Sequence, residues 1–292
     1  MQLYKALNIG IILAMTNATN ALTFAIGAND TIVGRLTHAT IQRGESLADI
    51  GRQFNLGIFE MIEANTKMHY LRPKAGATVV IPSQFIIPDG KREGIIVNLP
   101  EMRLYYFHPN KRAVSTFPIG IGRTNWTTPL GATRITEKKK NPDWTPPKSI
   151  RKVYEAKGKF LPAVVPAGPN NPLGDYALRL GIPGYLIHGT NMPKSVGMRS
   201  SSGCIRMFPE DIAALFNMVR VGTKVQIIHD AYKIGSLNDT LYLEAHDPLP
   251  EEIYGSENLE DELANHNTSV VNWRRAEHAV EITSGYPVVI SD

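Results

Sequence analysis

The chain has 292 residues, 43% of them hydrophobic and 20% charged, with a formal net charge of +4 and a single cysteine. One cysteine cannot form an intrachain disulfide or build a zinc-ribbon, iron–sulfur or CxxC redox site, so disulfide-stapled scaffolds and these metal and redox classes are excluded. A length near 300 residues corresponds to about two domains.

The net charge hides an uneven distribution. Residues 241–292 contain eleven Asp or Glu against Arg274 and Arg275, a balance of −9, so residues 1–240 carry +13. A basic body indicates an anionic partner, and nucleic acid is the first class to consider. The only dense basic run is Lys138–Lys140, and the chain has no zinc finger and no RNP-type aromatic signature. The sequence therefore predicts no nucleic-acid partner.

The N-terminus has the layout of a secretory signal peptide. Lys5 precedes the apolar stretch Ala6–Met15, and small residues suit cleavage after Ala21. About ten apolar residues are too few to span a bilayer, and no later stretch approaches the ~18 that a transmembrane helix needs. We predict that residues 1–21 are removed and that the protein is exported to the periplasm or cell wall, with no stable membrane span. A buried first helix or a retained anchor is the alternative.

Residues 38–82 are predicted to form a small module with the order strand, helix, helix, strand. The strands are expected at Ala39–Gln42 and Thr78–Pro82, and apolar residues at helical spacing indicate helices that begin near Leu47 and Ile58. The whole module occupies about 45 residues, which is small for a domain.

This βααβ module resembles a LysM module. The matching features are the turn Gly44-Glu45-Ser46-Leu47, the polar residue Asn65 near the second helix, and the closing pair Ile81-Pro82. The resemblance implies binding to the N-acetylglucosamine-containing glycan of peptidoglycan. The alternative is a small α+β fold without a ligand.

Residues 83–91 are predicted to be a linker to a second domain over 92–230. Short β-type runs separated by Pro and Gly are typical of an all-β sandwich or barrel. One flanking helix is expected from Pro209 to before Gly222, where apolar residues share one face. The acidic extension 231–292 has no predicted role. The expected strands cover 95–99, 102–107, 114–120, 131–136, 176–180, 185–188 and 223–228.

Residues 141–193 contain nine of the 20 prolines. A segment so rich in proline is not expected to be a central strand, and a long ordered loop inside a domain is usually functional. We therefore expect a lid or substrate-binding loop, with a plain surface excursion as the alternative.

Cys204 is the only sulfur nucleophile available. A lone cysteine is usually an inert buried side chain. Here small residues precede it, Arg206 lies two residues further on, and a helix is expected to begin within five residues. Positive charge and helix N-terminal N–H groups favour the thiolate, so we expect the thiol pKa to lie below its reference value of about 8.5.

His188 is the candidate base for this thiol. It ends an apolar strand 16 residues before Cys204, and the loop Gly189–Ser202 could fold back to bring the two side chains together. A Cys–His nucleophile needs a third group that orients the base, and Asp175 or a backbone carbonyl could do so. No HExxH or comparable spacing is present, which disfavours a zinc hydrolase. A merely hydrogen-bonded histidine at a strand end is the alternative.

The segments around His188 and Cys204 resemble the signature of YkuD-type L,D-transpeptidases, the ErfK/YbiS/YcfS/YnhG-like family. The resemblance covers roughly Lys91–His229 and implies a predominantly β, sandwich or barrel catalytic domain with one flanking helix, following the LysM-like module in an α+β chain. Ser202 departs from the commonest form, which has His there. The matching segments are Ile187–Thr190, Ser201–Met207 with Asp211, Gly122 with Thr128–Gly131, Asn171–Gly174 and Gly222–Val225.

The family resemblance implies a role for each residue of the site. Cys204 would be the nucleophile and His188 the general base and later acid, oriented by the Gly189 carbonyl. The backbone N–H groups of Gly203 and Cys204 would form the oxyanion hole. Arg206 either binds a substrate carboxylate or pairs with Asp211. The remaining substrate-contacting candidates are Ser202 and Thr190.

The implied reaction is acyl transfer on peptidoglycan tetrapeptide stems, without a metal or organic cofactor. The terminal D-Ala would leave, and a thioester would pass to an amine of another stem, forming a 3→3 crosslink, or to a lipoprotein lysine. Two alternatives remain from the sequence: an L,D-carboxypeptidase or endopeptidase that uses water, and a non-catalytic peptidoglycan-binding protein.

Overall fold

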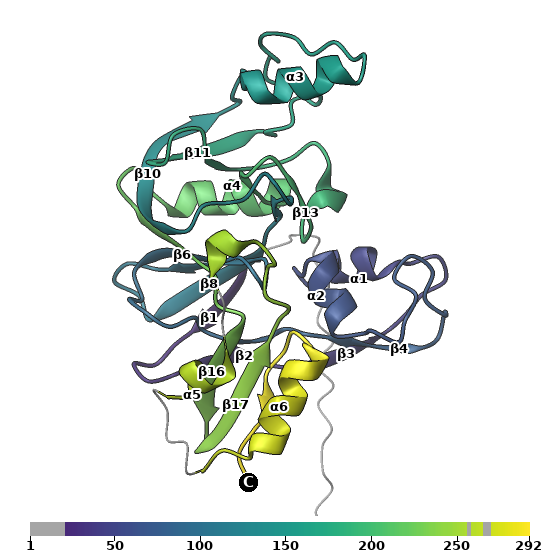
Figure 1. The fold of residues 1–292 in the computed structure, drawn as a ribbon, viewed down its shortest axis with the longest axis vertical. Helices are drawn as coiled ribbons and strands as arrows, with labels where there is room; N and C mark the ends of the chain where they lie inside the picture. The colour runs from purple at the N-terminus through teal and green to yellow at the C-terminus, as the bar shows by residue number, and fades with distance from the viewer. Residues whose placement is uncertain (1–20, 256–257, 265–269) are drawn as a thin grey trace, which may run out of the picture.

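The computed structural model describes residues 21–255, 258–264 and 270–292 (Figure 1). The predicted signal peptide, apart from Ala21, lies outside these residues. Within the described ranges, no helix is both long enough and apolar enough to cross a membrane.

A nine-stranded sheet forms the centre of the molecule. Two-residue β9 (Ile121–Gly122) pairs separately with β13 (Arg199–Ser201). The predominantly β architecture expected for residues 92–230 is confirmed. The order of the large sheet is β1 (Leu22–Ala25), β8 (Ala113–Pro118), β7 (Arg103–Phe107), β6 (Gly94–Asn98), β15 (Lys224–Ile228), β10 (Gly131–Lys140), β11 (Tyr176–Leu180), β12 (Leu186–His188) and β14 (Ile205–Arg206).

The large sheet curls because β10 serves both of its halves. Residues 131–134 of this strand pair with β15, and residues 135–140 pair with β11. The register shifts between Ile135 and Glu137, and such a bulge bends a strand and increases its twist. The half that carries β11, β12 and β14 therefore folds over the half that carries β6, β7 and β8.

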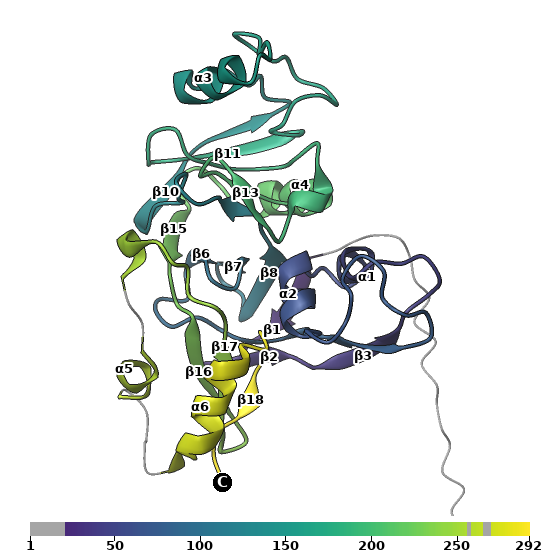
Figure 2. The ribbon, with the colours of Figure 1, turned by 45° about the vertical axis from the view of Figure 1, so that its right-hand side comes forward.

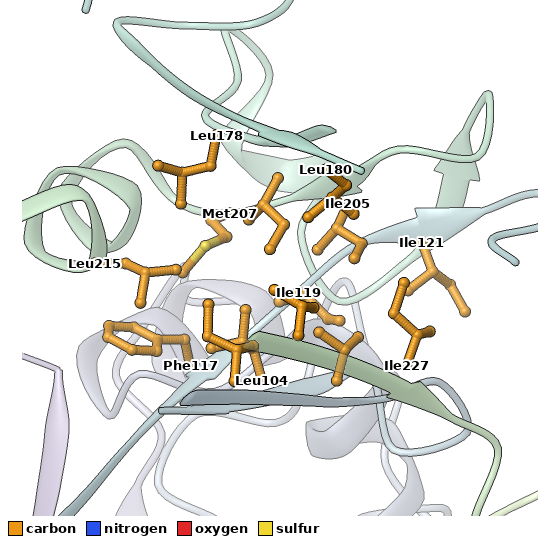
Figure 3. Packing of buried hydrophobic residues seen from close by; sticks show 14 of the residues in the cluster. Leu104, Phe117, Ile119, Ile121, Leu178, Leu180, Ile205, Met207, Leu215 and Ile227 are labelled. Carbon is orange, nitrogen blue, oxygen red and sulfur yellow. The ribbon is translucent and has the colours of Figure 1, made fainter. Parts of the chain in front are cut away.

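Apolar side chains fill the space between the two halves (Figure 3). Leu178 and Ile205 point into it from one half, and Leu104 and Phe117 point into it from the other. Leu215 comes from α4 (Pro209–Met218), the expected flanking helix, which the structure confirms. This core holds β12, which ends at His188, and β14, which begins directly after Cys204.

The N-terminal module has the predicted order: β3 (Thr37–Thr40), α1 (Leu47–Gln53), α2 (Ile58–Glu63) and β4 (Thr78–Ile81). Ser46 caps α1 through a capping box with Asp49. Asn65 is buried, its Nδ2 donates to the carbonyls of Met61 and Val80, and its Oδ1 accepts from the Val80 N–H, so it ties α2 to β4.

The module and the large sheet share a core. Alternate residues of β7 point to opposite faces, so Leu104 and Tyr106 enter the core of the large sheet while Tyr105 and Phe107 pack against the module. All five β7 residues are buried for this reason.

The segment expected to be a linker is instead ordered. Residues Gln84–Ile86 form β5, which pairs antiparallel with β2 (Ile32–Gly34), and Phe85 and Ile86 are buried. The apolar side chains of residues 85–87 are buried. The residues Pro88, Asp89 and Gly90 indicate a turn, but they do not show that the preceding residues form a buried strand.

The proline-rich segment contains an unpredicted helix, α3 (Lys148–Ala156), at the end of the molecule opposite the C-terminus (Figure 1). None of its residues is buried. Fully buried Asn171 holds the base of the loop, because its Nδ2 donates to the carbonyls of Pro142 and Pro166 at 2.8 and 3.1 Å.

The acidic extension forms a compact unit. Its sheet is β16 (Tyr232–Leu237), β17 (Thr240–Ala245) and β18 (Val288–Val289), packed against α5 (Leu259–Leu263) and α6 (Trp273–Ile282) (Figure 2). Asn238 and Asp239, both with positive φ, make the two-residue turn between β16 and β17.

Two short 3₁₀ helices complete the described part of the chain, η1 (Pro193–Ser195) and η2 (Glu252–Tyr254).

Candidate active site

The strand that ends at His188 lies beside the strand that follows Cys204, because β12 and β14 pair in parallel. Ile187 pairs with Ile205 and His188 pairs with Arg206. Cys204 directly precedes β14, so the register places it beside Leu186 of β12. Leu186 and His188 lie two residues apart, on the same side of β12. The pairing thus closes the 16-residue separation in the sequence.

The His188 ring is buried and held by a backbone carbonyl. Its Nδ1 lies 2.6 Å from the Gly189 oxygen. Burial first, and the charge of Arg206 second, lower the pKa of His188 to about 4, while the carbonyls of Gly189 and Leu173 oppose this shift. The ring is therefore neutral near pH 7. The other candidate for orienting it, Asp175, is exposed.

The Cys204 thiol is half-buried, and its sulfur lies 3.7 Å from the Gly184 carbonyl. Burial raises the pKa of Cys204, although the Leu186 N–H and the Arg206 charge act in the opposite direction. The expected lowering of this pKa is therefore wrong, because loss of solvation outweighs the nearby cation. Among the described residues, no hydrogen bond joins the thiol to the His188 ring, and both groups rest in their neutral forms.

The turn before Cys204 requires glycine. Gly203 has a φ of +102°, and a Cβ there would stand 2.8 Å from Cε1 of Tyr185 and 3.1 Å from the Thr127 carbonyl. Its N–H donates to Ser201 Oγ at 3.1 Å, so this predicted oxyanion donor is engaged in the resting structure. Ser201 Oγ also donates to the Cys204 carbonyl at 2.6 Å.

Thr128 belongs to the framework of the site, a role that the sequence does not predict. Its hydroxyl donates to the Gly203 carbonyl at 2.9 Å and accepts from the Gly122 N–H at 3.0 Å. The family segments around Gly122 and Thr128 therefore meet at the Cys204 turn. The family motif includes Thr128, but the motif alone does not show which atoms the Thr128 hydroxyl contacts.

Arg206 faces the site with unused hydrogen-bonding capacity. Its Nη1 donates to Ser200 Oγ at 3.3 Å, and its Nε is buried with no partner among the described residues. The predicted alternative, a pair with Asp211, is wrong. The Asp211 carboxylate instead accepts from Asn55 Nδ2 at 2.8 and 3.0 Å, so its partner is a residue of the N-terminal module.

The remaining predicted residues lie around this turn. Ser202 Oγ accepts from Arg123 Nη1 at 3.3 Å. Thr190 is buried, and its hydroxyl accepts from the Met192 N–H at 3.0 Å, which shapes the loop after His188. Burial lowers the pKa of Arg206, and the positive charge of Arg123 acts on it in the same direction.

One cluster of metal-ligating residue types occurs in the described part of the chain, away from Cys204. Glu101, Glu244 and His246 present ligand atoms within 4.8 Å of one another. The Lys233 ammonium contacts both carboxylates. It occupies the position that a cation would need, so these residues are an ion-paired cluster.

Comparison with known proteins shows which family the chain belongs to. Residues 92–227 match the YkuD family, described as the L,D-transpeptidase catalytic domain. The chain is 40% identical over 264 residues to "Probable L,D-transpeptidase YcfS" of Escherichia coli (strain K12), covering 86% of this chain and 82% of that protein. It is 41% identical over 257 residues to "Probable L,D-transpeptidase ErfK/SrfK" of the same strain, covering 85% and 83%. The NMR structure of the catalytic domain from E. faecium L,D-transpeptidase aligns with a TM-score of 0.36 and 22% identity, covering 47% of this chain and 96% of that one.

Proposed function

Because the chain belongs to the YkuD family of L,D-transpeptidases, we propose that Cys204 and His188 catalyse acyl transfer from peptidoglycan tetrapeptide stems to an amine. The observation that carries the proposal is the pairing of β12 with β14, which places the only thiol of the chain beside the strand that ends at His188.

In the first step, Cys204 Sγ attacks the carbonyl carbon of the third stem residue, a diamino acid, and His188 takes the thiol proton. The C–N bond to the terminal D-Ala breaks, and its amine leaves with the proton that His188 returns. Nδ1 of His188 faces the Gly189 carbonyl and carries the proton, so Nε2 acts as the base. A thioester on Cys204 remains.

In the second step, an amine attacks the thioester, His188 removes its proton, and the thiolate leaves and is reprotonated. An amine on the third residue of a neighbouring stem gives a 3→3 crosslink, and a lysine of a lipoprotein gives a wall anchor. The neutral thiol and neutral imidazole of the resting site mean that the thiolate forms only when the base removes its proton.

Arg206 is proposed to bind a carboxylate of the stem. Its half-buried guanidinium has an unpaired Nε, and Arg123 adds a second cation nearby. Arg recognises carboxylates through two parallel hydrogen bonds, which Lys cannot reproduce. Arg206→Lys should therefore raise KM for the donor stem, with a smaller effect on kcat.

The main test uses the purified full chain and disaccharide-tetrapeptide, followed by mass spectrometry. Loss of D-Ala with an acyl adduct on Cys204 and formation of dimer supports transpeptidation. Loss of D-Ala with tripeptide alone indicates hydrolysis instead, and an unchanged substrate contradicts both. Cys204→Ala and His188→Ala should abolish turnover, while His38→Ala, an exposed histidine elsewhere, should retain it.

We further propose that residues 38–82 act as a LysM-like module that binds peptidoglycan glycan. The βααβ order supports this, and the loop between α2 and β4 exposes Tyr70 and Leu71. The Tyr70 carbonyl accepts the Leu47 N–H, which brings this loop beside the turn at 44–46. Tyr70→Ala should weaken co-sedimentation of the full chain with peptidoglycan sacculi while leaving turnover of soluble stems unchanged; equal co-sedimentation would refute the module's role.

We also propose that the protein is exported and that residues 1–21 are its signal peptide. The apolar run and the small residues before Leu22 support this assignment. After expression in cells with an intact secretion system, the N-terminus of the periplasmic protein should be Leu22. Recovery of protein that still begins at Met1 would contradict it.

A further inference from the structure

The C-terminal extension reaches the Cys204 turn. The chain that follows β17 runs from the small sheet up past β15 to η2 (Figure 2). Leu249 and Tyr254 in this stretch are buried and belong to the core cluster of the catalytic domain. We call residues 247–254 the arm.

Tyr254 anchors the loop that supports Gly203. Its hydroxyl donates to the Thr128 carbonyl at 3.0 Å, and its ring stacks on His229 with centroids 5.2 Å apart. The Thr128 hydroxyl in turn donates to the Gly203 carbonyl at 2.9 Å. Two hydrogen bonds thus connect the arm to the residue before Cys204.

Glu251 holds the other side of the same turn. Its carboxylate forms an ion pair with Arg199, the first residue of β13, and both side chains are largely buried. β13 ends at Ser201, whose hydroxyl bonds to the Gly203 N–H and the Cys204 carbonyl. The arm therefore contacts both segments that shape the turn, the loop at Thr128 and strand β13.

The arm starts from a rigid base. Lys233 of β16 pairs with Glu101 and Glu244, and His246 pairs with Glu244 and Glu63, all in the interior. Glu101 belongs to the catalytic domain and Glu63 to the N-terminal module. This cluster therefore locks the extension against both other parts of the molecule at the point where the arm begins.

We propose that the acidic extension is a positioning element of the active site, in which Tyr254 and Glu251 hold the Cys204 turn in its reactive geometry through Thr128 and Arg199. The proposal rests on Cys204 being the nucleophile. The extension binds through specific buried contacts, and a small displacement of reacting groups is costly to rate.

The first test compares Tyr254→Phe with Tyr242→Phe in the full chain. Tyr242 lies on β17 of the same extension and has no side-chain hydrogen bond among the described residues. Tyr254→Phe should lower kcat for D-Ala release by about fivefold, the equivalent of one ordinary hydrogen bond, with KM and Tm nearly unchanged. Tyr242→Phe should match the wild type.

The second test addresses the ion pair with Glu251→Ala, Arg199→Ala and the double variant. If the pair acts as a unit, each single change should lower kcat and the double variant should lower it no further than the more damaging single change. Wild-type kcat in both Tyr254→Phe and Glu251→Ala would overturn the proposal. A fall in kcat matched by a loss of folded protein would overturn it too, because it would report a structural role only.

Alkylation of Cys204 by iodoacetamide separates this proposal from the proposed function. Its rate depends on how the turn presents the thiol and needs no stem substrate. A rate changed at least threefold in Tyr254→Phe supports positioning, and an unchanged rate overturns it. If the wild-type chain forms no acyl adduct, the proposed function fails, and the alkylation rates alone decide the role of the arm.

Discussion

The Nδ1 atom of His188 lies 2.6 Å from the carbonyl oxygen of the next residue, Gly189. A carbonyl oxygen accepts only, so Nδ1 carries the proton and Nε2 carries the lone pair. The backbone itself therefore sets the tautomer that a general base requires, without a carboxylate. Burial accounts for the rest of the ring's behaviour, because it disfavours the charged form.

This tautomer predicts a pH profile for acylation. With the pKa of His188 lowered to about 4, the ring stays neutral well below the usual histidine range. The rate should hold on the acid side to about pH 5 and fall as the ring is protonated, because a protonated ring cannot accept the thiol proton. Single-turnover D-Ala release between pH 3.5 and 8 measures this limb. A midpoint near 6.5 would contradict the buried, neutral ring.

The same shift affects stability. The unfolded chain binds a proton at His188 below about pH 6.5, whereas the folded chain resists it down to about 4. The folded state therefore loses stability as the pH falls across this window. His188→Gln, which cannot be protonated, should flatten that part of the stability curve in urea titrations.

Asp211 should show the opposite pH dependence. Burial raises its pKa to about 7, with the Asn55 amide opposing this shift. The folded state thus favours the protonated carboxyl, and stability should fall as the pH rises from about 4 through 7. Asp211→Asn cannot ionise and should remove this loss. The variant should therefore gain stability over the wild type at pH 8, and gain less at pH 5. Equal urea midpoints for the variant and the wild type at both pH values would contradict it.

Much of the fold and the site could be predicted from local patterns. The βααβ order and α4 follow from periodicity, and the pairing of β12 with β14 agrees with the predicted fold-back of the loop after His188. Asp211 was misassigned because its partner, Asn55, lies 156 residues away, beyond any spacing argument. The predicted lowering of the Cys204 pKa was wrong because burial raises this pKa, and the burial of a side chain depends on the packed structure.

The C-terminal extension was missed for a different reason. Its signal was present in Asn238-Asp239, a dipeptide suited to a two-residue hairpin turn, with apolar residues on both sides. The acidic composition of residues 241–292 predicts only a negative charge and does not show the hairpin. The helix α3 also had a sequence signal, since Ile150, Val153 and Tyr154 recur at the spacing of one helix face, but the surrounding prolines favoured the prediction of a loop.

Lys233 should be essential to the docking of the extension. Its ammonium is almost fully buried between Glu101 and Glu244, and their attraction raises its pKa against the effect of burial. Lys233→Met would remove the ammonium shared by two buried carboxylates and leave His246 as the remaining cation of the cluster, and breaking a buried pair typically costs about 3–5 kcal/mol. Lys224→Met, which removes an exposed pair with Glu93, should leave the free energy of unfolding nearly unchanged. Similar urea midpoints for the two variants would contradict the buried cluster.

Gly203→Ala should separate backbone strain from steric collision at the catalytic turn. Gly203 and Gly184 both have positive φ, at +102° and +87°, so alanine strains the backbone at either position. Only at Gly203 would the new Cβ meet Tyr185 and the Thr127 carbonyl, whereas nothing lies within 4 Å at Gly184. Gly203→Ala should therefore move the N–H groups of Gly203 and Cys204 and lower kcat by about 10²-fold or more, as expected for a displacement near 1 Å. Gly184→Ala should lose stability with a much smaller loss of kcat. Equal kcat in the two variants, measured by D-Ala release at matched folded fractions, would show that contact at Gly203 does not position the nucleophile.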